Sequence, residues 1–160
     1  MNTEKRLIIY TDGAALGNPG KGGYGVVMLW GNARKEMAEG FEHTTNNRME
    51  LLAVIVALET IKKPDIKIHI YTDSKYVCDA IEKKWVFGWQ RAGWKNKKNV
   101  DLWQRFLNVY KQHDVQMHWV KGHAGIKENE VCDKLATSMA QNGPWKKDHG
   151  YMEIVKNGLL

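Results

Sequence analysis

The stretch Gly20–Trp30, GKGGYGVVMLW, decides between two folds. Its first six residues fit the template G-x-G-x-x-G, which in dinucleotide-binding folds leads directly into a helix. Here Gly25 is followed by Val26–Trp30, an apolar run typical of a strand. A P-loop is excluded as well, because Gly22 stands where Ser or Thr should follow Lys21. The glycines are therefore predicted to serve a hairpin turn and not a nucleotide.

Strands are predicted on both sides of this turn. Leu7–Thr11 is a short buried strand, Tyr24–Trp30 is the second, and Lys35–Thr44 alternates as a third. A helix is predicted from Thr45, its N-cap, to about Lys63. The later elements are a strand over 66–72, a helix over 75–84 capped by Ser74, a helix over 99–113, a strand over 115–120 and a helix over 128–142.

This order of elements predicts an α/β fold. Three antiparallel strands, followed by alternating helices and strands, favour a five-stranded mixed sheet with parallel later strands and helices on both faces. A chain of 160 residues suits one domain, predicted over residues 1–142. The periodicity of the tail, residues 143–160, leaves open whether it packs.

Composition favours a cytoplasmic protein without a membrane partner, and the protein is expected to be a monomer. No segment approaches the roughly 20 apolar residues of a membrane span, and the first residues lack a secretory pattern. The two cysteines, Cys78 and Cys132, have no partner at metal-motif spacing. They are expected to be reduced, buried thiols.

The positive charge is concentrated in one segment. The net charge is +6, and the segment 82–98 contains six Lys or Arg residues against one acid. Lys and Arg bind phosphates without base preference, and exposed aromatic rings stack on sugars or bases. The segment, with Lys97 and Lys98, is therefore predicted to bind nucleic acid, although an amphipathic helix with core tryptophans is the alternative. Its aromatic residues are Trp85, Phe87, Trp89 and Trp94.

Two acids follow strands in similar tetrapeptides. Asp12 lies in YTDG after the first strand, and Asp73 lies in YTDS after the fourth. Strand ends in α/β sheets are where ligands gather, especially when the strands are neighbours. Taken singly, each aspartate is more commonly a turn former or a helix cap.

Two further acids lie on apolar helical stripes. Glu50 is followed at helical spacing by small and apolar residues, and so is Asp133. Both are predicted to face the sheet, where an unpaired carboxylate is costly. An ion pair between Glu50 and Arg48 is the simpler alternative.

Convergence of the four acids would require divalent cations. Like charges about 4 Å apart repel by roughly 4 kcal/mol at an effective dielectric near 20. Carboxylates without a Cys or His cluster suit Mg²⁺ or Mn²⁺, and a pair of such ions supports attack of water on a phosphodiester. His123, in the glycine-flanked loop VKGHAG, is either an ordinary surface residue or a proton shuttle near this site.

Five blocks of the sequence resemble one family, type 1 ribonuclease H in its bacterial form, from about Arg6 to Ala140. The blocks are YTDGAALGNPGKGGYG, TTNNRMELLAVIVALE, YTDSKYV, NVDLWQRF and WVKGHAGIKENEVCDKLA. The resemblance implies the ribonuclease H-like fold. It also implies endonucleolytic cleavage of the RNA strand in RNA–DNA hybrids, which leaves 5′-phosphate and 3′-hydroxyl ends.

The same resemblance implies roles for individual residues. Two Mg²⁺ ions would be bound by the four acids, Asp12, Glu50, Asp73 and Asp133. His123 would assist proton transfer or product release. The substrate contacts would be Asn18, Asn46 and Asn47 to the RNA strand, Thr45 and Asn99 to a phosphate of the DNA strand, and Trp85 and Trp89 to DNA sugars.

Departures from the family pattern leave these ligands intact. The basic segment is shorter between Lys95 and Asn99, and Lys75 stands where Gln is usual. Hybrid binding is therefore expected to be weaker or more salt-sensitive. Two alternatives stay open: a resolvase- or integrase-like nuclease of the same superfamily, and a hybrid-binding module that does not cut.

Overall fold

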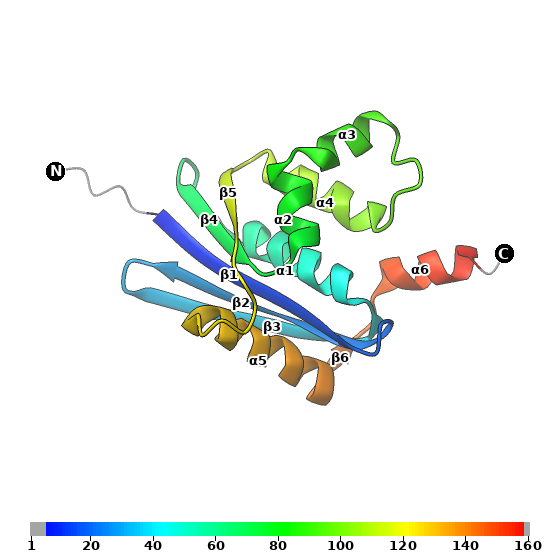
Figure 1. The fold of residues 1–160 in the computed structure, drawn as a ribbon, viewed down its shortest axis with the longest axis horizontal. Coiled ribbons are helices and arrows are strands. Elements are labelled where there is room, and N and C mark those ends of the chain that lie inside the picture. The colour runs from blue at the N-terminus through cyan, green and yellow to red at the C-terminus, as the bar shows by residue number, and fades with distance from the viewer. Residues whose placement is uncertain (1–5, 159–160) are drawn as a thin grey trace.

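The structure is a computed structural model that describes residues 6–158. Its centre is a six-stranded sheet with helices on both faces (Figure 1). The strands are β1 (Arg6–Leu16), β2 (Gly20–Trp30), β3 (Ala33–Thr44), β4 (Lys67–Thr72), β5 (Asp114–Trp119) and β6 (Trp145–Lys146). The helices are α1 (Asn46–Thr60), α2 (Lys75–Glu82), α3 (Trp85–Arg91), α4 (Val100–Tyr110), α5 (Lys127–Asn142) and α6 (His149–Gly158).

The strand order, β5-β4-β1-β2-β3-β6, confirms the predicted α/β fold with a mixed sheet. β1, β2 and β3 pair antiparallel, whereas β4 runs parallel to β1 and β5 runs parallel to β4. The predicted count of five strands is wrong by one, because the tail forms β6, which pairs parallel with β3. A strand of two residues is too short to produce an alternating pattern in the sequence.

Helix α1 is the central element on one face of the sheet. Thr45 caps its N-terminus, as predicted, by accepting a hydrogen bond from the backbone N–H of Arg48 at 3.2 Å. The helix ends at Thr60, before the predicted Lys63. Because α1 packs against both the sheet and α4, it is buried around most of its circumference and has no single apolar stripe.

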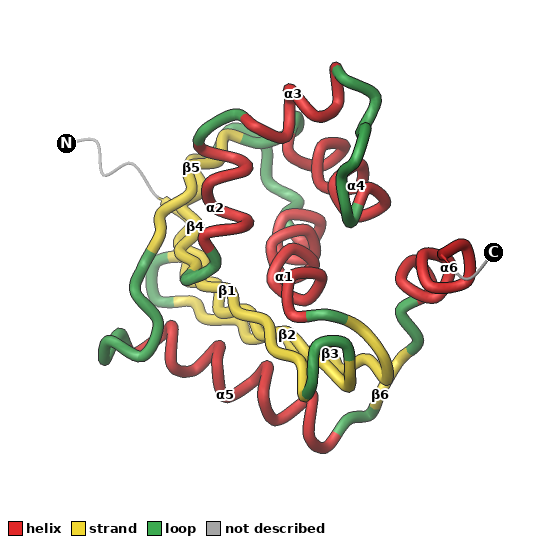
Figure 2. The backbone as a smooth tube through the Cα atoms, turned by 45° about the vertical axis from the view of Figure 1, so that its right-hand side comes forward, coloured by secondary structure: helices red, strands yellow, loops and turns green. Residues whose placement is uncertain are grey.

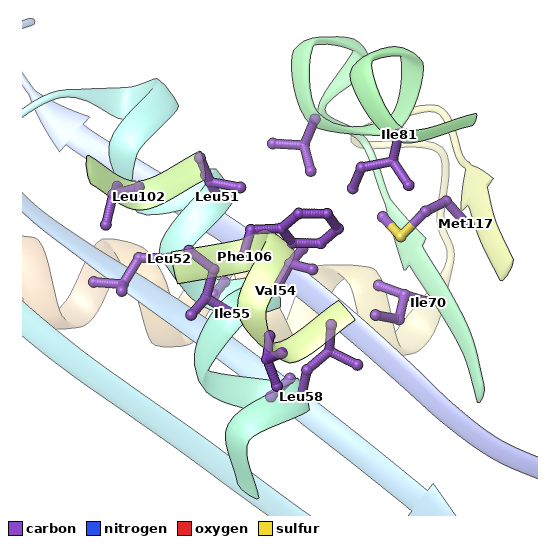
Figure 3. Packing of buried hydrophobic residues seen from close by; sticks show 14 of the residues in the cluster. Leu51, Leu52, Val54, Ile55, Leu58, Ile70, Ile81, Leu102, Phe106 and Met117 are labelled. Carbon is purple, nitrogen blue, oxygen red and sulfur yellow. The ribbon is translucent and has the colours of Figure 1, made fainter. Parts of the chain in front are cut away.

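The hydrophobic core forms between α1, α4 and this face of the sheet. Phe106 from α4 lies beside Val54 and Leu51 from α1 (Figure 3). Trp103, also from α4, is fully buried, and its indole N–H donates a hydrogen bond to the Tyr76 hydroxyl at 2.8 Å. The buried ring therefore has its polar group satisfied.

Helix α5 lies on the opposite face, where it packs against β1, β2 and β3 (Figure 2). This packing needs glycine in β2, since a Cβ on Gly25 would lie 2.5 Å from the carbonyl oxygen of Cys132 and 2.7 Å from Cβ of Leu135. The prediction that the glycines of GKGGYG form the hairpin turn is thus wrong. They lie inside β2, and the turn is formed by residues 17–19.

Both cysteines are buried and unpaired, as expected. Burial raises the pKa of the Cys78 thiol to about 11, so this thiol is a poor nucleophile at neutral pH. Over residues 6–158, no helix has the length and apolar character that crossing a bilayer requires.

Candidate active site

Three acids from separate elements meet where β1 and β4 stop pairing. The prediction that Asp12 follows the first strand is wrong, because β1 continues to Leu16 and Asp12 lies inside it, whereas Asp73 does follow β4. Asp12 follows Thr11, and Asp73 follows Thr72. These two threonines lie in register in the neighbouring parallel strands β1 and β4. Glu50 comes from the first turns of α1. One carboxylate oxygen from each acid lies within 4.8 Å of the others. The structure therefore brings together residues that are up to 61 positions apart in the sequence.

Gly13 allows this approach. Its backbone N–H donates hydrogen bonds to Oδ1 of Asp12 at 2.9 Å and to Oε1 of Glu50 at 3.1 Å. A Cβ on Gly13 would overlap the backbone nitrogen of Glu50, so a larger residue would push α1 away from β1. The glycine thus both orients two of the acids and sets the distance between their elements.

Burial and mutual repulsion oppose ionisation of the three acids. Burial, helped by the charge of Asp73, raises the pKa of Asp12 to about 7. Burial and the neighbouring Asp12 raise the pKa of Glu50 well above its usual value, and burial also raises that of Asp73. Such carboxyl groups become anionic most readily when a cation is bound among them.

One oxygen of the cluster has no protein partner. Oε2 of Glu50 is buried and, within residues 6–158, accepts no hydrogen bond. A buried carboxylate oxygen without a donor is costly, and the Glu50 carboxylate to which it belongs is grouped with those of Asp12 and Asp73. Oxygen ligands of this kind fit a hard divalent cation such as Mg²⁺ or Mn²⁺.

Arg48 does not neutralise Glu50, so the alternative ion pair is wrong. Its guanidinium is 1% exposed and points to other acids. It donates to Oδ2 of Asp101 at 2.7 Å and to Oδ2 of Asp148 at 2.8 Å. The Thr44 hydroxyl also donates to Asp148, at 2.7 Å. Asp101 and Asp148 lie 53 and 100 positions away from Arg48 in the sequence, so no local pattern could have indicated these ion pairs.

Asp133 and His123 line the same cleft, which has a volume of about 490 Å³. Asp133 lies outside the tight group of three, but its charge helps to raise the pKa of Asp12, after burial and Asp73. His123 is exposed, with a left-handed backbone at φ 56°. The preceding Gly122 lies against Asp73, since a Cβ there would come within 2.7 Å of its Oδ2. The loop therefore lies directly against Asp73, one of the three acids.

A second cleft, of about 820 Å³, shares Asn47 with the acidic cleft. It is lined by most of the other predicted substrate residues, namely Asn18, Thr45, Lys97, Lys98 and Asn99. Asn46 instead lines the acidic cleft. Oδ1 of Asn18 accepts a hydrogen bond from the Asn46 backbone N–H at 3.0 Å, which joins the β1–β2 turn to the start of α1. Seven of the predicted substrate residues thus line two clefts that share Asn47, whereas Trp85 and Trp89 line neither of these clefts.

The basic segment forms α3 and the loop that follows it, and its aromatic residues are divided between surface and core. Trp85 is 47% exposed, with Nζ of Lys83 5.1 Å from its ring centroid. Trp89 is half-buried, edge-on to Trp103 at 5.7 Å, and Nζ of Lys97 lies 4.9 Å from its ring. The remaining two, Phe87 and Trp94, pack partly against the core. The alternative of core aromatics therefore holds in part.

Two features near the clefts were not predicted from the sequence. Trp119, 45% exposed, donates its indole N–H to the backbone carbonyl of Asp73 at 3.1 Å, and Nζ of Lys75 lies 4.8 Å from its ring. Helix α6 lines the second cleft with Tyr151 and Ile154. Trp119 could have been proposed as a site residue from the sequence, because it is an aromatic residue near the end of a predicted strand and directly precedes VKGHAG. No local signal indicated where α6 docks.

These observations define an α/β protein with a cluster of three acids between β1, β4 and α1 that could hold a metal ion. The cluster lies next to a cleft lined by Lys97 and Lys98. A family model described as RNase H matches residues 4–141. The chain therefore belongs to the ribonuclease H family, and the predicted resemblance is confirmed. This answers the choice that the sequence left open between this family and a resolvase- or integrase-like nuclease.

Individual relatives agree with this assignment. The chain is 56% identical to ribonuclease H of Desulforamulus reducens over 142 residues, covering 86% of this chain and 89% of the relative. It is 51% identical to ribonuclease H of Shewanella denitrificans, covering 96% of this chain and 98% of the relative. These similarities identify the chain as a ribonuclease H enzyme.

Solved structures of RNase H1 proteins share the fold. LC9-RNase H1, described as a type 1 RNase H with the type 2 active-site motif, has a TM-score of 0.77 at 32% identity, covering 88% of this chain and 74% of that one. RNase H1 from Halobacterium salinarum has a TM-score of 0.67 at 26% identity, covering 86% and 99%. LC11-RNase H1, solved in complex with an RNA/DNA hybrid, has a TM-score of 0.63 at 25% identity, covering 82% and 94%.

Proposed function

We propose that this chain, acting as a monomer, hydrolyses the RNA strand of RNA–DNA hybrids and leaves 5′-phosphate and 3′-hydroxyl ends. Two Mg²⁺ ions, or Mn²⁺ in their place, are held by Asp12, Glu50, Asp73 and Asp133. The observation that carries the proposal is the convergence of the first three carboxylates within 4.8 Å. Bound divalent cations supply the positive charge that activates water and stabilises the leaving oxygen in phosphodiester hydrolysis.

The acids need this positive charge. Two full charges 4.8 Å apart repel by about 3.5 kcal/mol at an effective dielectric near 20. The Gly13 N–H holds one oxygen of Asp12 and one of Glu50, which leaves their other oxygens for a cation. The unpartnered Oε2 of Glu50 is one of these. Asp133, at the edge of the cleft, completes the ligand set.

His123 has the position of a proton carrier. It lines the acidic cleft from an exposed loop, and it does not belong to the tight group of carboxylates. An imidazole at this place can take a proton from, or deliver one to, the oxygens at the reacting phosphate. Its exposure allows the proton to exchange with solvent afterwards.

The two clefts suit the two strands of a hybrid. Amide side chains beside the acids can hydrogen-bond to 2′-hydroxyl groups, which only the RNA strand carries. The second cleft adds lysines that bind phosphates of the other strand. In this arrangement Asn18, Asn46 and Asn47 contact RNA, and Thr45, Asn99, Lys97 and Lys98 contact DNA phosphates. Trp85 and Trp89, which lie in the basic segment outside these two clefts, contact DNA sugars. The complex of the relative LC11-RNase H1 with an RNA/DNA hybrid supports this choice of substrate.

The proposal is tested with end-labelled RNA–DNA, RNA–RNA and DNA–DNA duplexes, each incubated with Mg²⁺, with Mn²⁺ and with excess chelator. Cleavage of the RNA strand of the hybrid alone, and only with metal, is expected. Mass spectrometry of the fragments should show 5′-phosphate and 3′-hydroxyl ends. Gel filtration of the active enzyme should give the mass of one chain.

The variant Asp12→Asn separates cutting from binding. It should lose cleavage but still shift the hybrid in a gel, because the cations of the basic segment are intact. Full cleavage by this variant, or by the wild-type chain in chelator, would refute the metal assignment. Equal cleavage of RNA–RNA duplexes would refute the proposed substrate.

A further inference from the structure

The acidic cleft contains a lysine that has no ion-pair partner. Lys75, the first residue of α2, lines the same cleft of about 490 Å³ as the three acids. Its side chain is exposed, and among residues 6–158 no carboxylate forms an ion pair with it. A cation in the first turn of a helix opposes the helix dipole, so Lys75 does not stabilise α2. Its positive charge is therefore available to an anionic ligand.

The indole of Trp119 holds this lysine in place. Nζ of Lys75 lies 4.8 Å from the centroid of the ring, within the roughly 6 Å over which an aromatic face attracts an ammonium group. The indole is held in turn, because its N–H donates a hydrogen bond to the backbone carbonyl of Asp73 at 3.1 Å. Trp119 is also the last residue of β5 and lies in register with Thr72, the last residue of β4. The position of Lys75 is thus tied to the strand that leads into Asp73.

This pair of Lys75 and Trp119 lies on the side of the acids that is away from the second cleft. The acids come from β1, from α1 and from the residue after β4, and β5 is the edge strand beyond β4. Helix α6, which lines the second cleft, follows β6 at the opposite edge of the sheet. Figure 2 accordingly shows β5 and α6 on opposite sides of α1. Because the proposed function assigns the DNA strand to the second cleft, the strand that passes Lys75 is the RNA strand.

We propose that Lys75, positioned by Trp119, binds a phosphate of the RNA strand that neighbours the phosphate being cleaved. The inference rests on the proposed function and adds a charged contact on the cut strand to the amide contacts proposed above. Each nucleotide carries one phosphate, so a strand with one phosphate at the acids presents others on either side of it. Lysine binds phosphate as a point charge and without base preference. The contact therefore suits hybrids of any sequence.

The lysine acts on the substrate and does not take the place of a metal ion. An ammonium group only donates hydrogen bonds and cannot ligate a cation. Within residues 6–158 Lys75 pairs with none of the carboxylates of the cluster, so the acids keep their oxygens for the ions. The effect of Lys75 is therefore expected in KM and its salt dependence, and not in the dependence of the rate on Mg²⁺.

The first test is steady-state cleavage of an end-labelled RNA–DNA hybrid at saturating Mg²⁺ over a series of KCl concentrations. Lys75→Gln should raise KM by roughly three- to tenfold with little change in kcat, and it should reduce the slope of log KM against log salt by about 1. Lys75→Arg keeps the charge and should retain the wild-type slope. The matched control is Lys63→Gln, which removes an exposed lysine whose Nζ lies 5.3 Å from the Trp30 ring, just past the end of α1 that is opposite to Glu50. The control should change neither KM nor the slope.

The variant Trp119→Leu tests whether the ring acts through the lysine. It should raise KM in the wild-type chain but have a much smaller effect on KM when combined with Lys75→Gln. Its far-ultraviolet circular dichroism should match the wild type. An equal rise in KM in both backgrounds would overturn the positioning role of Trp119.

Neutral linkages in the hybrid identify the strand that Lys75 contacts. A methylphosphonate in place of one RNA-strand phosphate near the cleaved bond removes the charge that the lysine binds. At one such position the wild-type chain and Lys75→Gln should have the same KM. A methylphosphonate in the DNA strand should leave the difference between them unchanged.

Three outcomes would overturn the inference and leave the proposed function intact, because in each of them the wild-type chain cuts the hybrid. In the first, Lys75→Gln has the wild-type KM and salt slope. In the second, Lys75→Gln changes only the dependence of the rate on Mg²⁺. In the third, only neutral linkages in the DNA strand abolish the difference in KM. A wild-type chain that cuts no hybrid would refute the proposed function itself, and the inference with it.

Discussion

The substitution Asp12→Asn should make the metal-free protein more stable while it removes activity. Asp12 is 4% exposed, and burial raises the pKa of its carboxyl to about 7. At neutral pH the folded state therefore carries an anionic group in an environment that disfavours it. Asparagine keeps the shape and an oxygen that accepts the hydrogen bond from the Gly13 N–H, but it has no charge.

The size of the effect follows from the pKa. A carboxyl group with a pKa of about 7 in the folded state, against about 3.9 in the unfolded chain, lowers stability by at most about 4 kcal/mol above pH 7. Asp12 shares its cleft with Glu50 and Asp73, which relieve part of this penalty by taking up protons. We therefore expect a gain of about 2 kcal/mol, which corresponds to roughly 4–8 °C in melting temperature for a chain of this size.

The assay is thermal unfolding in chelator, followed by circular dichroism between pH 4 and pH 8. Because the folded pKa is raised, the penalty is fully present above about pH 7 and fades as the pH falls toward the unfolded pKa of about 3.9, where the folded group is protonated and the unfolded group is about half protonated. The variant should thus be more stable at pH 8 and nearly equal to the wild type at pH 4. Mg²⁺ should stabilise the wild type only.

Asp65→Asn, at an exposed acid with φ 58°, is the control and should change little. An Asp12→Asn variant that melts at or below the wild-type temperature at pH 8 would refute the electrostatic account of the cluster.

Three further outcomes are expected. Replacing Lys97 and Lys98 by Ala should raise KM and reduce the slope of log KM against log salt by roughly 1–2, measured by initial rates over a salt series, and an unchanged slope would remove them from the phosphate contacts. Asp148→Asn should lower stability by about 1–3 kcal/mol in urea at pH 7, because the buried Arg48 loses an anionic partner. Burial alone would raise the pKa of Asp148, but hydrogen bonds from Arg48 and Thr44 outweigh it and lower the pKa. The wild-type advantage should therefore be present above about pH 4 and disappear as the pH falls through the lowered pKa. His123→Ala should reduce kcat by roughly 100-fold with little change in KM, and a loss confined to KM would contradict a role in proton transfer.

Features set by neighbouring residues in the chain were predictable. Thr45 and Ser74 both cap helices as expected, with the Ser74 hydroxyl accepting from the Val77 N–H at 3.2 Å. A cap needs only the few residues that follow it, so the sequence carries the whole signal. The direction of β4 was also predictable, because α1 connects it to β3 by a crossover that makes these two strands parallel, and β3 runs in the same direction as β1.

Features set by distant partners were not predictable from local patterns. Arg48 was a reasonable partner for Glu50 from spacing alone. Its actual partners, Asp101 and Asp148, depend on where α4 and the tail dock. β6 and α6 were missed for the same reason, since the tail is positioned by pairing with β3 and by this ion-pair network.

The glycines of the opening stretch show why a motif can be misread and still mark the functional site. In β1 and β2, Asp12 lies directly opposite Gly25. Because Gly25 has no side chain, α5 can approach β2 at Cys132, the residue before Asp133. Because Gly13 has no side chain, α1 can approach β1 at Glu50. A Cβ at either position would move a helix away from the sheet and take an acid out of reach of Asp12. The glycines therefore serve the site through close helix packing on both faces of one strand pair, and a dinucleotide-binding template matches them only because it also requires close approach to a backbone.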